Sequence, residues 1–295
     1  MELRQLRYVV AVAETAHFTR AAERCHVVQS ALSHQIAKLE HELGARLFDR
    51  AGRRVRLTAA GEAFLPSARQ ALEATSRARA EVAAVTGEVR GRLALGAINP
   101  VTAVDLPELL ATFHARYPKV RVALRTGPSL ELAAQVRDGE LDGAFLGMPP
   151  SIRPTGVRHM RLGNGELVAI VHPRHPRAGQ HIARLRDLAE EPSVDFPAGT
   201  AARAESDEAF AAAGIEREVT FEVSSMELLA QLVRRGLGVG LVPTAYAADL
   251  PGVIRLPLAD APGRLEFFVW AKAQPAPATI AWLPLLGAHH SDPVT

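Results

Sequence analysis

Five polar side chains between residues 30 and 41 have the types and the spacing to face a negatively charged partner. Ser30, Ser33, His34, Lys38 and His41 are spaced so that a helix would carry them on one side. Their hydroxyl, imidazole and ammonium groups donate hydrogen bonds, and no carboxylate stands among them. A solvated helix face usually mixes both charge signs, so this composition indicates a partner that would repel a carboxylate.

The other side of the same stretch is apolar. Leu32, Ile36, Leu39 and Leu43 recur at steps of four, three and four residues, so a helix would bury them together. Packing of this side against a core would hold the polar side outward.

Positive charge is concentrated near the N-terminus. Residues 1–60 contain ten Arg and Lys against six Asp and Glu, a net charge of +4, whereas the 295 residues together carry +2, which leaves −2 for the remainder. A basic module on a mildly acidic body is typical of a protein that binds a polyanion with one end. On the charge distribution alone, binding of a polyanion and a chance asymmetry of surface charge are equally favoured.

Three short helices are predicted before residue 44. Residues 2–15 have apolar residues at helical spacing, and "FTRAAERC" follows, with Thr19 placed to cap a short second helix. A tight turn at residues 26–28 separates the second helix from the third. This layout predicts a helix-turn-helix.

A β-hairpin is predicted directly after the third helix, because alternating apolar residues lie on both sides of the turn "AGRR". Arg53 and Arg54 stand at its tip. Arginines that only face solvent would look the same in sequence, and the position beside the polar helix favours a role in binding.

A long helix is predicted from Thr58, its N-cap, to about Val85. An alanine-rich stripe repeats along it at alternating steps of four and three residues, which is typical of a dimer seam. Docking of the helix on its own domain would give the same pattern, and the dimer is favoured. Pro66 lies inside the helix and predicts a kink near its start.

From about residue 90 the sequence alternates between strands and helices. This order predicts a parallel sheet covered by helices, in two α/β lobes with a ligand-binding cleft between them. The stretches that read as strands include 93–98, 120–127, 141–147, 166–173, 219–225, 238–243 and 265–272, and those that read as helices include 203–213 and 225–236.

The order of these parts resembles the LysR family of bacterial transcriptional regulators. The resemblance is carried by "LRYVVAVAETAHFTRAAERCHVVQSALSHQIAKLEHELGARLFDR" and "RVRLTAAGE". It continues less sharply through "LLATFHARYP", "VRDGELDGAFLG" and "LVRRGLGVGLVP", so that it covers nearly the whole chain. It implies a sequence-specific DNA-binding transcriptional regulator whose activity a small effector modulates, and not an enzyme.

The resemblance implies a fold of class α + α/β in three parts. Residues 1–58 would form a winged helix-turn-helix, residues 59–89 a linker and dimerisation helix, and residues 90–295 an effector domain. The effector domain would resemble a periplasmic binding protein, with one lobe over about 90–161 and 266–295 and the other over about 162–265.

The family's DNA contacts carry over to nine positions of this chain. The third helix would lie in the major groove, where Gln29 pairs with an adenine edge or a phosphate, the serines allow close approach, and His34 and Lys38 reach phosphates or guanine. Plain surface serines remain an alternative for the two serines. The implied DNA-binding residues are Thr19, Arg20, Gln29, Ser30, Ser33, His34, Lys38, Arg53 and Arg54.

Two positions depart from the family pattern. The family usually has Ser or Thr before the glutamine, where this chain has Val28, and often Pro after it, where this chain has Ser30. Loss of a capping side chain costs about 1 kcal/mol. Either change could alter the tilt of the helix and the DNA sequence that it prefers.

The family's effector contacts carry over to turns that follow strands in both lobes. Small polar groups and helix N-termini at such turns favour an anionic head group, although ordinary helix caps would look the same. The implied residues are Asn99, Val101, Thr102, Thr126, Gly127, Phe196, Ala198, Gly199 and Thr200.

The expected partners are double-stranded DNA, a small effector, and further copies of the chain as a homodimer or homotetramer. No cofactor, metal or membrane partner is expected. Cys25 is the single cysteine, so no intrachain disulfide can form, and a packed small side chain is favoured over a thiol sensor. The single cysteine fits a reducing compartment, and the sequence has no apolar run long enough to span a membrane, so we predict a cytoplasmic protein.

The competing class is a small-molecule-binding protein or enzyme whose N-terminal module serves only to oligomerise. No nucleophile elbow, HExxH sequence or paired-cysteine site is present, and the glycines of "RRGLGVGL" precede a strand and not a helix. Retention of genomic DNA fragments would separate the two classes.

Overall fold

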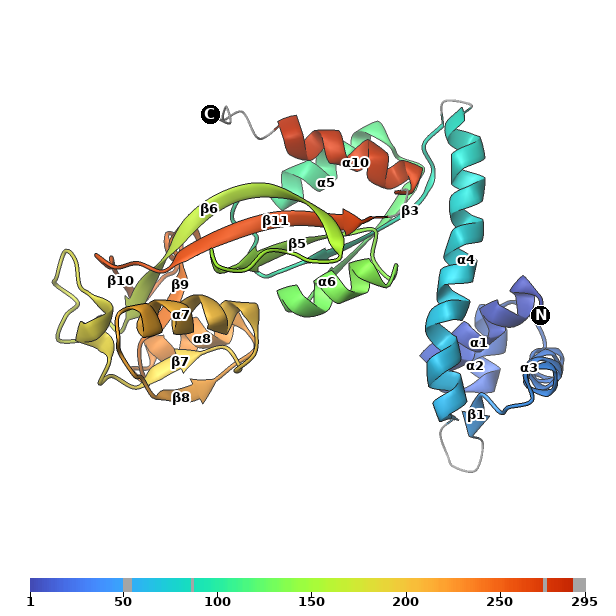
Figure 1. Ribbon diagram of the computed structural model, residues 1–295, viewed down its shortest axis with the longest axis horizontal. Coiled ribbons are helices and arrows are strands. Elements are labelled where there is room, and N and C mark those ends of the chain that lie inside the picture. Colours follow the sequence, from blue (N-terminus) through green and yellow to red (C-terminus); the bar gives the residue numbers. More distant parts are fainter. Residues whose placement is uncertain (50–54, 86–87, 273–274, 289–295) are drawn as a thin grey trace. The chain divides into compact units, whose positions relative to one another are not determined.

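The computed structural model describes residues 1–49, 55–85, 88–272 and 275–288. The chain divides into two compact units, Met1–Gly91 and Arg92–Thr295 (Figure 1). Each unit has a hydrophobic core of its own.

The first unit begins with three helices that form the predicted helix-turn-helix. They are α1 (Leu3–Thr15), α2 (Phe18–Arg24) and α3 (Gln29–Leu43). Their apolar sides enclose one core, to which α1 contributes Val9 and Val12, α2 contributes Ala21, and α3 contributes Leu32 and Ile36. The short turn between α2 and α3 contains His26, whose φ of 55° is left-handed.

The predicted cap of α2 is wrong by two residues. His17 is the N-cap, and its imidazole Nδ1 accepts a hydrogen bond from the amide of Thr19 at 3.2 Å, so that Thr19 lies inside the helix. The helix starts at Phe18, whose ring packs edge to face against Phe48 with centroids 5.9 Å apart. Thr19 is therefore exposed on the first turn of α2.

The apolar side of α3 is confirmed over three of its four predicted positions. Leu32, Ile36 and Leu39 are fully buried, whereas Leu43 is 41% exposed at the last residue of the helix. Val28 is the N-cap and supplies no capping side chain, in agreement with the sequence.

The hairpin, or wing, consists of β1 (Phe48–Asp49) and β2 (Arg56–Leu57), which pair antiparallel. The carboxylate of Glu40 on α3 accepts hydrogen bonds from the amides of Leu47 and Phe48 at 2.8 and 3.2 Å, and so ties the wing to α3. The tip, with Arg53 and Arg54, lies outside the described residues.

Helix α4 (Ala59–Val85) follows the wing and is continuous past Pro66 (Figure 1). Thr58 caps it as predicted, because its hydroxyl accepts a hydrogen bond from the amide of Gly61 at 3.1 Å. A Cβ at Gly61 would lie 2.1 Å from the carbonyl oxygen of Leu47. Only glycine allows α4 to start this close to the wing.

The second unit is built on a mixed sheet whose strand order is β10-β6-β11-β5-β3-β4, with β9 also paired to β6. Strands β3 and β5 are parallel, as the sequence predicts, whereas β11 runs antiparallel to both of its neighbours. Strands β9 and β10 also pair antiparallel with β6, so the predicted parallel sheet is mixed. The strands of the first lobe are β3 (Gly91–Ala97), β4 (Val120–Thr126) and β5 (Gly143–Met148).

Helices cover both faces of the first lobe (Figure 1). Helices α5 (Leu106–Arg116) and α10 (Pro277–Ala288) lie together on one face, and α6 (Ser129–Arg137) lies on the other. Trp282 on α10 is fully buried and packs edge to face against Phe113, with ring centroids 5.3 Å apart.

The second lobe contains a two-stranded parallel sheet and the extensions of the large one. Its strands are β7 (Ser193–Asp195), β8 (Val219–Glu222), β9 (Gly240–Pro243) and β10 (Ile254–Leu256). Its helices are the 3₁₀ turn η1 (Leu185–Leu188), α7 (Ala201–Ala212), α8 (Met226–Arg234) and the short α9 (Thr244–Ala247).

Two long strands connect the lobes. Strand β6 (Val157–Val171) pairs along its first part with β11 (Gly263–Ala271) and along its last part with β9 and β10 (Figure 1). The β6–β11 register shifts between Glu266 and Phe267. We call this pair the connecting ribbon.

Candidate functional site

The first candidate site is the outward side of α3. Gln29, Ser30, His34 and Lys38 are exposed and Ser33 is half-buried, so the predicted polar side faces away from the core. The Lys38 ammonium lies 3.9 Å from the exposed carboxylate of Glu2. An exposed pair at this distance contributes little to stability, so Lys38 can exchange this partner for another anion.

The N-terminus of α3 adds backbone donors to this surface. The carbonyl of Val28 accepts hydrogen bonds from Ala31 and Leu32, and no capping side chain covers the first turn. The first amides of a helix point along its axis and carry partial positive charge, which suits a phosphate oxygen. Thr19 and Arg20 are exposed at the start of α2 in the same unit.

The second candidate site is a cavity of about 430 Å³ between the two lobes of the second unit. Five residues expected from the sequence line it. Asn99, Thr126 and Gly127 follow strands β3 and β4 of the first lobe, and Phe196 and Thr200 lie between β7 and α7 of the second. We call this cavity the cleft.

Four other expected residues are not among those that line the cleft. The amide and hydroxyl of Thr102 donate to the carboxylate of Glu266, which turns the loop after β3 toward β11, and Val101 lies in the same loop. Ala198 and Gly199 are exposed on the turn before α7, where Gly199 has a φ of +82°.

Three helices begin at the cleft. Ser129, the first residue of α6, lines it, as do Thr200 and Ser225, the N-caps of α7 and α8. The hydroxyls of Thr200 and Ser225 accept from amides of their own helices, Arg203 and Leu228. Together, three positive helix ends favour a negatively charged group in the cleft.

Apolar side chains complete the lining. Phe196 and Met226 come from the second lobe, and Ile98 and Pro100 from the first. The cleft therefore combines an apolar wall with polar groups at strand ends and helix starts, as a site for a small organic molecule does.

Arg264, at the start of β11, is a charged residue of the cleft that sequence reasoning missed. Arg264 is only 6% exposed. Its Nη1 lies 2.9 Å from both carboxylate oxygens of Glu205 on α7, and its Nε lies 3.3 Å from Glu266. The available signal was weak: an arginine and a glutamate two residues apart in an otherwise apolar strand.

The two carboxylates beside Arg264 have different surroundings. Glu266 also accepts hydrogen bonds from the amides of Thr102 and Ala103 and from the Thr102 hydroxyl. Among the described residues, Glu205 accepts only from Arg264. Burial raises the pKa of Glu205 to about 7, although Arg264 opposes the rise.

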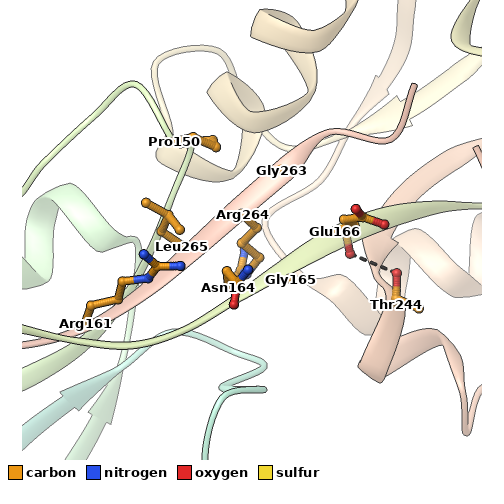
Figure 2. Close-up of a pocket in the computed structure, with 9 residues that line it drawn as sticks. All are labelled: Pro150, Arg161, Asn164, Gly165, Glu166, Thr244, Gly263, Arg264 and Leu265. Carbon is orange, nitrogen blue, oxygen red and sulfur yellow. Dashed lines mark hydrogen bonds between the residues drawn. The ribbon is translucent and has the colours of Figure 1, made fainter. Parts of the chain in front are cut away.

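A second cavity of about 540 Å³ lies along the connecting ribbon (Figure 2). This cavity is more open than the cleft, and both basic and acidic side chains line it. The hydroxyl of Thr244 donates to the carbonyl oxygen of Glu166 at 2.9 Å at one end of it. Arg264 borders this cavity as well as the cleft. The residues that line it are Pro150, Arg161, Asn164, Gly165, Glu166, Thr244, Gly263, Arg264 and Leu265.

Neither a metal centre nor a membrane span is found in the part of the chain that the structure describes. Within it, no three His, Cys, Asp or Glu residues come together as metal ligands would. Its helices are also too short or too polar to cross a bilayer.

Two protein families match the chain. Residues 3–62 match the family described as bacterial regulatory helix-turn-helix protein, lysR family, and residues 86–289 match the LysR substrate binding domain. These ranges contain the first candidate site and the cleft, respectively.

Several characterised proteins are similar along most of their length. The chain is 36% identical over 265 residues to the HTH-type transcriptional regulator ShiR of Corynebacterium glutamicum, with 88% of each chain covered. It is 35% identical over 249 residues to the transcriptional dual regulator GltC of Bacillus subtilis, with 84% of this chain and 83% of GltC covered. It is 32% identical over 261 residues to the dual regulator OxyR of Escherichia coli, with 87% and 85% covered.

Solved structures show the same fold. The crystal structure of CbnR, a LysR family transcriptional regulator, is 27% identical with a TM-score of 0.75, and the match covers 99% of this chain and 100% of CbnR. Full-length CbnR complexed with its target DNA is 28% identical with a TM-score of 0.73, covering 98% and 100%.

Proposed function

Because this chain belongs to the LysR family of DNA-binding transcriptional regulators, which are not enzymes, we propose that it reads its operator with α3 and senses a small anionic metabolite in the cleft. The observation that carries the DNA-reading part is the exposed side of α3, which presents donors without a carboxylate on a buried apolar base.

In this proposal, α3 lies in the major groove. Gln29 pairs with an adenine edge or a phosphate, Ser30 and Ser33 allow the helix to approach the bases, and His34 and Lys38 contact phosphates or guanine acceptors. A carboxylate on this side would repel the DNA backbone, which accounts for its absence there.

The flanking residues would position α3. Thr19 and Arg20 on α2 would contact the backbone beside the groove, and Arg53 and Arg54 at the wing tip would contact phosphates or the minor groove. The bond from Glu40 to the wing supports this arrangement, because it ties the hairpin to the reading helix.

The cleft would take an organic acid. The three helix N-termini supply positive potential, Arg264 supplies a hydrogen-bond donor, and Phe196 and Met226 supply an apolar wall. A ligand there would touch both lobes, and thereby favour one arrangement of the lobes over another and change promoter activity.

We also propose that two or four copies of the chain act together. The alanine-rich stripe of α4, within the proposed dimerisation segment 59–89, would allow two helices to approach closely. Paired wings and paired α3 helices would then grip two half-sites of an operator.

The experiment that tests DNA reading is to sequence the genomic fragments that the purified full-length protein retains. We expect a small set of fragments that share a motif, with retention that weakens steeply as salt rises, because phosphate contacts release counterions. Equal retention of all fragments would contradict sequence-specific reading, and no retention at low salt would contradict the interface itself.

The effector part is tested by isothermal titration calorimetry with a panel of organic acids. Binding of at least one acid, and not of its uncharged amide, is the expected result. Binding only of cations or of neutral apolar compounds would contradict the anionic assignment.

A further inference from the structure

We propose that Arg264 binds the carboxylate of the effector at the floor of the cleft, and that Glu205 takes up a proton when it does so. This inference rests on the proposed function of the cleft as the effector site. It adds the residue that recognises the acid and a linkage between effector binding and pH.

Gly147 leaves room for the Arg264 guanidinium beside the cleft. Gly147 on β5 and Arg264 on β11 both line the cavity. A Cβ at position 147 would lie 2.3 Å from Nη2 of Arg264 and 2.6 Å from its Cζ. The guanidinium therefore occupies the space that a side chain at position 147 would fill, and only glycine lets Arg264 take this place at the edge of the cleft.

The hydrogen bonds of Arg264 leave one nitrogen for a ligand. Within the described part of the chain, Nη1 donates to Glu205 and Nε to Glu266, while Nη2 donates to no protein acceptor. Nη2 is the atom beside Gly147. A guanidinium nitrogen forms strong, charge-assisted hydrogen bonds to a carboxylate, so Nη2 can donate to an acid in the cleft.

The charges at this point favour proton uptake. One guanidinium lies between the carboxylates of two buried glutamates, so a bound acid would bring a third negative charge to a single cation. Two like charges at close range favour protonation of one of them. A proton on one glutamate would balance the incoming charge.

Glu205 is the carboxylate that would accept the proton. Glu266 accepts hydrogen bonds from three donors besides Arg264, whereas Glu205 has Arg264 alone among the described residues. The charged groups that act on Glu205 are Arg264 and Glu266 on β11 and Asp195 on β7, of which Asp195 is itself paired with Arg217. Its pKa of about 7 places the change within the physiological range.

The main experiment is isothermal titration calorimetry on the full chain with benzoate, phenylacetate and hexanoate, each paired with its uncharged amide. We expect the acids to bind and the amides not to bind. Because Glu205 must be protonated for the acid to bind and has a pKa of about 7, the affinity for the acid should be up to about tenfold tighter near pH 6 than near pH 8. Titration in two buffers of different ionisation enthalpy should show net proton uptake.

Two variants assign the effect to these residues. Gly147→Ala places a methyl group against Nη2 and should weaken acid binding by about tenfold or more. Gly165→Ala is the matched control, because a Cβ there meets nothing within 4 Å and Gly165 lines the cavity of Figure 2 and not the cleft. It should leave acid binding unchanged.

Glu205→Gln tests the proton directly and does not depend on the folding of Gly147→Ala. It is neutral at every pH and should bind the acids near pH 8 as tightly as wild type binds them near pH 6, with no proton uptake. Circular dichroism and DNA retention would show that each variant is folded.

Several outcomes would overturn the inference. Acid affinity that is independent of pH and equal in wild type and Gly147→Ala would show that the acid binds elsewhere in the cleft, and the proposed function would stand. Equal binding of acids and amides, or loss of binding in Gly165→Ala alone, would also overturn it. Binding of none of the acids by a protein that still retains its genomic fragments would remove the carboxylate site and leave DNA reading intact.

Discussion

Glu205 makes the stability of the second unit depend on pH. Its pKa is about 7 in the folded protein against 4.5 ordinarily, so between these values the folded state binds more protons than the unfolded state. The contribution of Glu205 to the free energy of unfolding should therefore be largest below about pH 4.5. It should be lost as pH rises through 7, and the total loss should be about 3 kcal/mol.

Chemical denaturation near pH 5 and near pH 8 would measure this fall. In Glu205→Gln the decline should largely disappear, because glutamine does not ionise. The exposed Glu216→Gln is a matched control in the same unit and should keep the wild-type decline. Equal slopes in wild type and Glu205→Gln would contradict the prediction.

Cys25 is expected to be a poor redox sensor. It lies half-buried against the core of the first unit, and burial raises the pKa of its thiol despite Arg24 and Arg7 nearby. A raised pKa lowers the fraction of reactive thiolate at neutral pH. Alkylation by iodoacetamide should be slower than for a free cysteine. Wild type and Cys25→Ala should both retain DNA with the same affinity whether or not hydrogen peroxide is added. Peroxide-dependent binding that disappears in Cys25→Ala would contradict this.

At the residue scale, the sequence predicted those cleft residues that end a strand or begin a helix, such as Asn99, Thr126 and Thr200. Their positions follow from local pattern. Arg264 and Glu205 were missed because they are 59 residues apart and meet only in the folded chain. Val101 and Thr102 were expected in the cleft, but the hydrogen bonds from Thr102 to Glu266 turn their loop away. No sequence pattern predicts the pairing of Thr102 with Glu266.

At the scale of elements, α3 and the wing should affect DNA binding in different ways. Ser33→Ala removes a hydroxyl from the reading side and should change which sequences are preferred, with about 1–3 kcal/mol of discrimination at one base position. The double change Arg53→Ala with Arg54→Ala should weaken binding to all sequences and reduce its salt dependence. Selection of binding sites from a random DNA pool, at two salt concentrations, measures both effects.

An unchanged salt dependence in the double arginine variant would show that the wing tip does not contact phosphate. An unchanged motif in Ser33→Ala would show that this serine is only a surface residue of α3.

Arg217 joins β7 to α7 and is expected to be essential for the second lobe. Its Nη2 lies 2.6 Å from the buried carboxylate of Asp195, and its guanidinium stacks 4.7 Å from the ring centroid of Phe210. Arg217→Met would leave Asp195 buried without its cation and should lower the free energy of unfolding by about 3–5 kcal/mol. Urea denaturation would measure this, with the exposed Arg186→Met as a control that should change little. A loss no larger than that of the control would contradict it.

The elements that the sequence predicted best are those with strong periodicity or a clear cap, such as α3 and α4. The first half of β6 was missed, because "VRHMRLGNGE" is mostly polar and exposed. That stretch becomes a strand because β11 pairs with it along its length, a contact about 100 residues away in the sequence. The mixed character of the sheet was missed for the same reason.

At the scale of the whole molecule, the two units should unfold separately. Each has its own core, and both tryptophans, Trp270 and Trp282, lie in the second unit. Differential scanning calorimetry should show two transitions, and tryptophan fluorescence should follow only one of them. An acid bound in the cleft should raise the midpoint temperature of the second unit's transition alone, because it binds only the folded form of that unit. A single transition, or an equal shift of both, would contradict independent units.

The irregular register in the connecting ribbon lies where the two lobes are joined. Paired strands resist bending, whereas a bulge concentrates local twist, and here it falls next to Glu266. Glu266 holds the amides of the loop that leaves β3. A ligand that displaces this loop would thus act on the ribbon beside its bulge, and we expect the twist of these two paired strands to change when the lobes reorient.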